Sequence, residues 1–178
     1  MENVFSKKRD HSIFSWTDLS NIKEARGSLG EEMPVIVYRL MQYTLLDVLT
    51  KNLGREKANH FIYEAGHLAG TEFAKNVLKL DVDLNTFVAN LHNTLIDLKI
   101  GILRIESVSE NAEEIVLTVS EDLDCSGLPI TGESVCDYDE GFISGILGVY
   151  TGKPYSVREI DCWASGARVC RFRCKVAA

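Results

Sequence analysis

The sequence predicts an α+β domain in which two β-hairpins form an antiparallel sheet and about four helices pack with it. Apolar residues recur at helical spacing in four segments, 35–53, the next segment to about residue 78, 84–98 and 137–150. Apolar and polar residues alternate in four others, 102–108, 114–119, 155–163 and 168–176. Because turn residues separate the members of each alternating pair, each pair is expected to form a hairpin. Helices and strands grouped in this way are typical of the α+β class.

The boundaries of the first three helices follow from residues that start or stop helices. Pro34 suits the first turn of a helix, and Gly54 is expected to end the first long one. Gly66 and Gly70 in the second helical segment permit the close approach of a neighbouring element. Asp83 is expected to cap the third helix at its N-terminus.

The last helix carries its own start, stop and packing signals. Asp137, with Glu140 three residues later, resembles a capping box, and the helix is expected to stop at the segment 152–154. A glycine-lined edge of this helix, expected to pack closely on the sheet, is formed by Gly141, Gly145 and Gly148.

The length of 178 residues is that of one domain, which buries roughly two-thirds to 70% of its unfolded surface. Residues 1–33 are polar and mixed, so we expect an N-terminal arm followed by a domain over 34–178. This arm and the almost continuously apolar segment after it favour a homodimer. An arm folded onto its own domain is the alternative.

Charge and hydropathy exclude two classes of partner. The chain has 19 basic and 26 acidic side chains, a net charge of −7, and no long basic run, so direct binding to nucleic acid is not expected. Its apolar stretches are far shorter than the ~20 residues that cross a bilayer, and residues 1–15 lack an apolar signal core. We therefore expect a cytoplasmic protein that does not bind membranes.

Five cysteines lie in the last third of the chain, and their odd number indicates metal or redox chemistry rather than a secreted disulfide framework. Cys162 and Cys170 each lie four residues from Gly166, which makes them cross-strand neighbours if Gly166 is near the hairpin centre. Glu159 reaches the same side if a bulge or bend separates it from Cys162. Cys136 lies just before the last helix, where the helix dipole favours a thiolate.

Three thiolates and one carboxylate are a plausible tetrahedral set for Zn²⁺, and a closed set of four is structural rather than catalytic. The spacing of Cys162 and Cys170 is also compatible with two buried core cysteines or with a disulfide, which a reducing compartment disfavours. Cys174 alternates in phase with Cys170 and is expected to be core.

Several short motifs resemble the signature of the 4-vinyl reductase domain family. They are Asp-Cys-Ser-Gly at 124–127, Ser-Val-Cys-Asp-Tyr-Asp-Glu-Gly-Phe at 134–142, Gly-Lys-Pro at 152–154, Arg-Glu-Ile-Asp-Cys-Trp-Ala-Ser-Gly at 158–166 and Val-Cys-Arg-Phe at 169–172. The resemblance is specific over 125–175, and the upstream helices match the family in order and length. It implies a small-molecule-binding sensory domain, related in fold to vesicle-tethering complex subunits, as in phenol-responsive transcription activators.

Carried onto this chain, the resemblance implies a zinc site and an adjoining pocket. Its implied zinc ligands are Cys136, Glu159, Cys162 and Cys170. The implied pocket is apolar and lined by Ile115, Leu117, Ile146 and Val157, which could equally be core. The chain departs from the family's phenol sensors, which have a tryptophan and a histidine in the pocket. Ile115 lies near the position of that tryptophan, and His92 lies several residues away from the position of that histidine.

These observations predict a non-enzymatic sensory domain with structural Zn²⁺ and a pocket for a small hydrophobic or aromatic ligand. One alternative is a redox sensor, with Cys125 as its solvent-accessible thiol. The other is a reductase or substrate carrier for a tetrapyrrole, but the sequence contains no pattern typical of a catalytic site.

Overall fold

The computed structural model describes residues 13–177 and divides the chain into two compact units, Met1–Pro34 and Val35–Ala178. The first unit contains the 3₁₀ turn η1, Trp16–Leu19, and the short helix α1, Ile22–Ala25. Residues 1–12 of the predicted arm lie outside the described residues.

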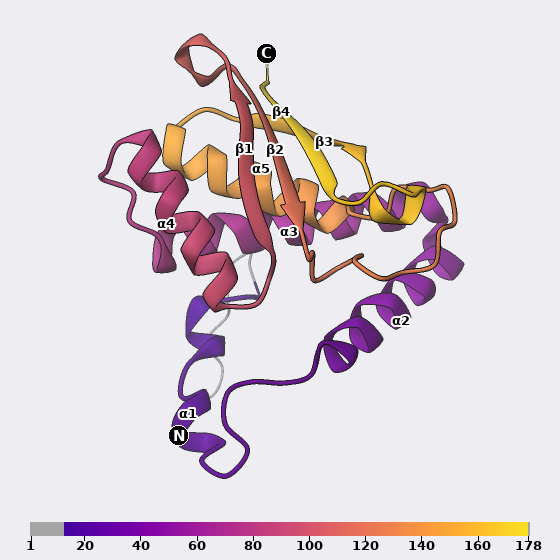
Figure 1. Cartoon of the computed structure of the whole chain (residues 1–178). Coiled ribbons are helices and arrows are strands. Elements are labelled where there is room, and N and C mark those ends of the chain that lie inside the picture. Colours follow the sequence, from indigo (N-terminus) through magenta and orange to yellow (C-terminus); the bar gives the residue numbers. More distant parts are fainter. Residues whose placement is uncertain (1–12, 178) are drawn as a thin grey trace, which may run out of the picture. The chain divides into compact units, whose positions relative to one another are not determined.

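The second unit begins with three helices (Figure 1): α2, Val35–Leu53; α3, Arg55–Val77; and α4, Leu84–Asp97. They fall where the helical spacing of apolar residues predicts them. Asp83 is the N-cap of α4, and its carboxylate accepts hydrogen bonds from the N–H groups of Asn85 and Thr86. This side chain satisfies two donors that have no partner within the helix.

The four strands form one antiparallel sheet in the order β1-β2-β4-β3. The first hairpin pairs β1, Ile102–Val108, with β2, Glu114–Ser120, across the turn η2, Glu110–Ala112. The second pairs β3, Tyr155–Asp161, with β4, Cys170–Val176, across the turn η3, Trp163–Ser165. Pairing of β2 with β4 joins the two hairpins, so the predicted α+β class is confirmed.

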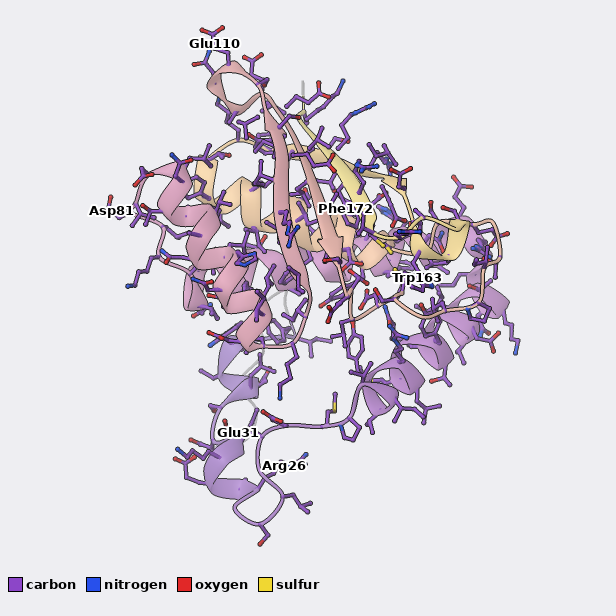
Figure 2. All side chains as sticks on the ribbon, viewed as in Figure 1. Arg26, Glu31, Asp81, Glu110, Trp163 and Phe172 are labelled. Carbon is purple, nitrogen blue, oxygen red and sulfur yellow. The ribbon has the colours of Figure 1, made fainter. Side chains whose placement is uncertain are left out.

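One face of the sheet forms the core with helix α5, Asp137–Thr151. Alternate residues of the strands point to this face, and Phe172 near its centre is fully buried (Figure 2). Ile115 and Leu117 of β2 and Val157 of β3 are also buried. Helix α5 contacts β3 and also α3, so it connects α3 to the sheet, and α4 contacts β1 directly.

Helices α3 and α5 cross at a contact made by glycines. A Cβ atom on Gly70 would lie 2.0 Å from the carbonyl oxygen of Phe142, and one on Gly141 would lie 2.1 Å from that of Tyr63. The predicted close approach at Gly66 and Gly70 is therefore confirmed. The predicted packing of Gly141 and Gly145 on the sheet is wrong, because both glycines face the backbone of α3.

Within residues 13–177, the structure contains no helix that is both long enough and apolar enough to span a lipid bilayer.

Candidate metal centre and apolar cavity

Four buried sulfur atoms converge from separate segments of the chain. They belong to Cys125 in the loop after β2, Cys136 at the N-cap of α5, Cys162 after β3 and Cys170 at the start of β4, and all lie within 4.8 Å of one another. The sulfur of Cys136 is 3.9 Å from that of Cys162 and 3.8 Å from that of Cys170. Tetrahedral Zn²⁺ with four thiolates has sulfur atoms about 3.8 Å apart. The two distances from Cys136 thus match those of a tetrahedral zinc–thiolate site.

Local hydrogen bonds hold the hairpin end of the cluster in place. The N–H groups of Thr131 and Gly132 both donate to the carbonyl oxygen of Ala164, which ties the long loop before α5 to η3. The indole N–H of Trp163 donates to the carbonyl oxygen of Leu128 at 3.1 Å. Gly166 has φ +102°, a conformation that side chains disfavour, so the turn between Cys162 and Cys170 depends on glycine.

Glu159 lies beside the sulfur cluster. The register of β3 against β4 shifts between Glu159 and Asp161, which is an irregularity of the kind that the sequence analysis invoked to turn this carboxylate. Both carboxylate oxygens are buried and have no hydrogen-bond partner. Burial raises the pKa of Glu159 to about 8, and this pKa also depends on the sulfurs of Cys136, Cys162 and Cys170. An unpartnered buried carboxyl group beside thiols is a candidate cation ligand.

Glu140 positions the backbone of Glu159 instead of capping α5. Its Oε1 accepts the N–H of Glu159 at 2.7 Å, and its Oε2 accepts Nη1 of Arg158 at 2.8 Å. The N-cap of α5 is Cys136, which makes no side-chain capping bond. The predicted capping box is therefore wrong, because the Glu140 carboxylate binds β3.

Contacts among the sulfurs shift the pKa values of Cys136 and Cys162 in opposite directions. Hydrogen bonding by the sulfurs of Cys125, Cys136 and Cys170 lowers the pKa of Cys162, whereas the corresponding bond with Cys125, followed by those with Cys162 and Cys170, raises the pKa of Cys136. The pKa of Cys136 therefore depends on its neighbouring sulfurs and on burial, and the prediction that the helix dipole favours a thiolate there stays a prediction. A cation would supply the charge needed to deprotonate the remaining thiols.

Cys125 is fully buried, although its loop position suggested an accessible redox thiol. Its sulfur lies 3.0 Å from that of Cys170. Asp122 folds the loop locally, because its Oδ1 accepts the N–H groups of both Asp124 and Cys125 at 2.9 Å. Cys174 is also buried, on β4, but it does not belong to the four-sulfur group.

Helix α2 holds the loop that carries Cys125. The hydroxyl of Tyr38 donates to Oδ1 of Asp124 at 2.7 Å, and that of Tyr43 donates to the Asp124 carbonyl at 3.0 Å. Arg39 donates to the carbonyl oxygens of Leu123 and Ser126, each at 2.8 Å. These partners are more than 80 residues apart in sequence, so local spacing did not indicate that Cys125 joins the cluster.

An apolar cavity of about 40 Å³ lies between the sheet and helices α4 and α5. Of the four residues predicted to line a pocket, Ile115, Leu117 and Ile146 line it, whereas Val157 is buried on β3 and is not among the lining residues. Polar groups reach it from Asp122 and Asp139, and the Oδ2 atom of Asp139 is buried without a hydrogen-bond partner. This volume is large enough for a water molecule but is well below the ~150 Å³ of a cavity that admits benzene.

His92 has a structural role in this region. Its Nδ1 atom lies 2.7 Å from the carbonyl oxygen of Leu103, which links α4 to β1, and the residue does not line the cavity. The cavity therefore contains no counterpart of the phenol sensors' histidine at this position.

The antiparallel sheet, its covering helices and the buried sulfur cluster define an α+β domain with a candidate metal centre. Residues 115–176 match the family model of the V4R domain, so the resemblance to the 4-vinyl reductase domain family is confirmed.

Two uncharacterized proteins of Methanocaldococcus jannaschii are similar in sequence. MJ0150 is 28% identical over 159 residues, 89% of this chain and 85% of that protein. MJ1642 is 28% identical over 148 residues, 83% of this chain and 81% of that protein.

Solved structures share the fold at low sequence identity. The phenol-responsive sensory domain of the transcription activator PoxR has a TM-score of 0.61 and 16% identity, covering 83% of this chain and 78% of its own. A vinyl-4-reductase family protein from Methanocaldococcus jannaschii has a TM-score of 0.60 and 17% identity, covering 94% and 99%. Subunit 3 of the trafficking protein particle complex from Naegleria fowleri, covalently bound to palmitic acid, has a TM-score of 0.60 and 13% identity, covering 82% and 98%.

Proposed function

We propose that this chain is a non-enzymatic sensory domain that contains a structural zinc site and binds a small hydrophobic or aromatic molecule. The observation that carries the proposal is the buried cluster of sulfurs, with the Glu159 carboxyl group beside it, next to an apolar cavity. The shared fold with the PoxR sensory domain supports a sensory role. A net charge of −7 favours a small-molecule ligand over nucleic acid, and the free thiols suit a reducing cytoplasm.

The proposed zinc ligands are Cys136, Glu159, Cys162 and Cys170. Their support is the 3.8–3.9 Å spacing of the sulfurs around Cys136 and the unpartnered carboxylate of Glu159. Four protein ligands leave no position for water, so the metal would join α5 to the second hairpin rather than catalyse a reaction.

Elemental analysis of protein purified without added metal tests the zinc site. We expect one equivalent of zinc, which is lost in the double variant Cys136→Ala, Cys162→Ala because two ligands are removed. Cys174→Ala is the matched control, since Cys174 is equally buried but lies outside the cluster. Less than about half an equivalent in the unmodified protein, with thiols that titrate freely in the native state, would contradict the proposal.

The proposed ligand occupies the cavity lined by Ile115, Leu117 and Ile146, which must widen to accept an aromatic ring. Phenol and toluene are suitable probes, because they differ only in the polar group that could meet Asp122 or Asp139. We expect at least one probe to raise the melting temperature of the zinc-loaded protein, and Ile146→Phe to abolish this rise without changing the zinc content. No rise with either probe would contradict a ligand of this class.

Helix α2 supports the proposed homodimer, because its apolar residues are left exposed. Ile36 is 74% exposed, Leu40 66% and Met41 62%, and Ile36 and Leu40 lie one turn apart on the same side of the helix. Multi-angle light scattering should give twice the chain mass for the unmodified protein and a monomer for Leu40→Glu. The control is Leu98→Glu, which alters an exposed leucine at the end of α4. A monomeric unmodified protein at micromolar concentration would exclude the dimer.

A redox sensor is the second candidate function, favoured by the 3.0 Å between the sulfurs of Cys125 and Cys170. Hydrogen peroxide would oxidise the two thiols to one disulfide and be reduced to two water molecules. Mass spectrometry of the peroxide-treated protein should then find a peptide that links these two cysteines. A sample without this link after mild oxidation would remove the redox function.

A further inference from the structure

We propose that Cys125 is an alternative fourth metal ligand, which competes with Glu159 for the last position on a metal held by Cys136, Cys162 and Cys170. This inference rests on the proposed metal site. It adds a donor that the sequence analysis did not assign to that site.

The geometry brings five donors to a site that needs four. The sulfur of Cys125 lies within 4.8 Å of the three other sulfurs, so one small ion can be reached by all four. Glu159 is not part of this four-membered group, although its carboxyl group interacts with Cys136, Cys162 and Cys170. The sulfurs of Cys136, Cys162 and Cys170 thus have two further donors beside them, the fourth sulfur and the carboxylate. Zn²⁺ in structural sites binds four ligands, so one of these two donors is in excess.

The fold places Cys125 at the cluster by means other than the metal. Asp122 accepts the N–H of Cys125, and the side chains of Tyr38, Arg39 and Tyr43 bind the loop on either side of it. Since these contacts already order the loop, the sulfur loses little conformational freedom when it binds an ion. The side chain is also fully buried, which prevents water from competing for the thiolate.

The exchange between the two donors conserves charge and atoms. With a metal bound, its bond to the Glu159 oxygen would break, a bond to the Cys125 sulfur would form, and the Cys125 proton would pass to the Glu159 carboxylate. Three thiolates with one carboxylate carry the same total charge as four thiolates. The exchange therefore leaves the formal charge of the ligand set unchanged.

X-ray absorption at the zinc edge distinguishes the two sets by counting sulfur neighbours in variants of the full chain. We expect Glu159→Gln to keep one equivalent of zinc with four sulfurs, and Cys125→Ser to keep one equivalent with three sulfurs and one oxygen. The double variant should lose affinity in a chelator competition by more than the ~10–100-fold typical of groups that only support a ligand. Cys174→Ala is the control and should match the unmodified protein in all three readouts.

Two results would overturn the inference: loss of zinc from Glu159→Gln alone, or a count of three sulfurs in that variant. Either would mean that Cys125 does not replace the carboxylate. Failure of the unmodified protein to bind zinc would instead overturn the proposed function, so the two failures are distinguishable. The sulfur count in folded Glu159→Gln decides the matter even if the double variant does not fold, and circular dichroism checks the fold of each variant.

Discussion

Glu140 is a buried acidic residue whose carboxylate accepts a hydrogen bond from the backbone N–H of Glu159 on β3. Replacing it by alanine leaves the N–H of Glu159 without its acceptor, so we expect Glu140→Ala to lower the free energy of unfolding by about 1–3 kcal/mol in urea titrations. Arg158 shares the carboxylate but is 73% exposed, and Arg158→Ala should cost no more than about 1 kcal/mol. An equal cost in both variants would show that the ion pair, not the backbone bond, is the stabilising contact.

Asp122 makes the stability of the metal-free protein depend on pH. Burial, followed by the charge of Asp124, raises the pKa of Asp122 to about 6. Because the folded state then binds its proton more tightly than the unfolded state, this contribution is fully present below about pH 4 and is lost as pH rises through about 6.

Asp122→Asn should remove this dependence while its amide oxygen still accepts the two loop N–H groups. We expect the free energy of unfolding of the unmodified apo-protein to fall more steeply between pH 4 and pH 7 than that of the variant, by on the order of 2 kcal/mol in urea titrations. Parallel curves for the two proteins would show that Asp122 has an ordinary pKa.

For single residues, sequence spacing predicts the position of a candidate metal ligand only where the ligand belongs to the same hairpin as another ligand. The hairpin turn at Gly166 accounts for Cys162 and Cys170, and the register shift near Glu159 required only the assumption of a bend. Cys125 could not be placed, because its position depends on side chains of α2 more than 80 residues away. The loop sequence alone therefore suggested an accessible thiol at Cys125, whereas the side chain is buried.

Among the elements, α3 and α5 are held at a distance that only glycine permits. Gly141→Ala would place a methyl group 2.1 Å from the backbone of α3, so we expect it to lower the free energy of unfolding by about 1–3 kcal/mol or more. Gly148→Ala is the matched control in the same helix, because its nearest neighbour would be 3.8 Å away. That substitution should be neutral or raise stability by up to about 1 kcal/mol, owing to the better helix propensity of alanine. Similar melting temperatures for both variants would contradict the tight crossing.

Periodicity predicted the existence and type of the main helices and strands, but not which of their surfaces meet. Alternation in 114–119 and 168–176 identified two strands, yet nothing local in them specified that β2 pairs with β4. The glycine edge of α5 likewise indicated a close contact without naming its partner, and the partner is a helix rather than the sheet. Long-range pairing depends on the whole core and has no local sequence signal.

For the molecule as a whole, the proposed metal would join the start of α5 to the second hairpin at one end of the domain. Chelation should therefore speed amide hydrogen exchange at Thr131 and Gly132, whose N–H groups bond across to η3, and at Glu140 in the first turn of α5. Amides within α3 should change little, because its glycine contact with α5 does not involve the cluster. Exchange that accelerates uniformly over residues 13–177 would show that the metal supports the entire fold instead of one end.

The glycine crossing also restricts where a bound molecule can make room for itself. Since α5 is clamped against α3 with no space for even a methyl group, that wall of the cavity behaves as a rigid support. Another wall is α4, whose Phe87 stacks on Tyr150 of α5 and whose His92 hydrogen-bonds with the main-chain oxygen of Leu103. The hydroxyl of Tyr150 also donates to the carbonyl oxygen of Val82, just before α4. A guest larger than the empty space would push outward on α4, making this helix the moving part of the domain.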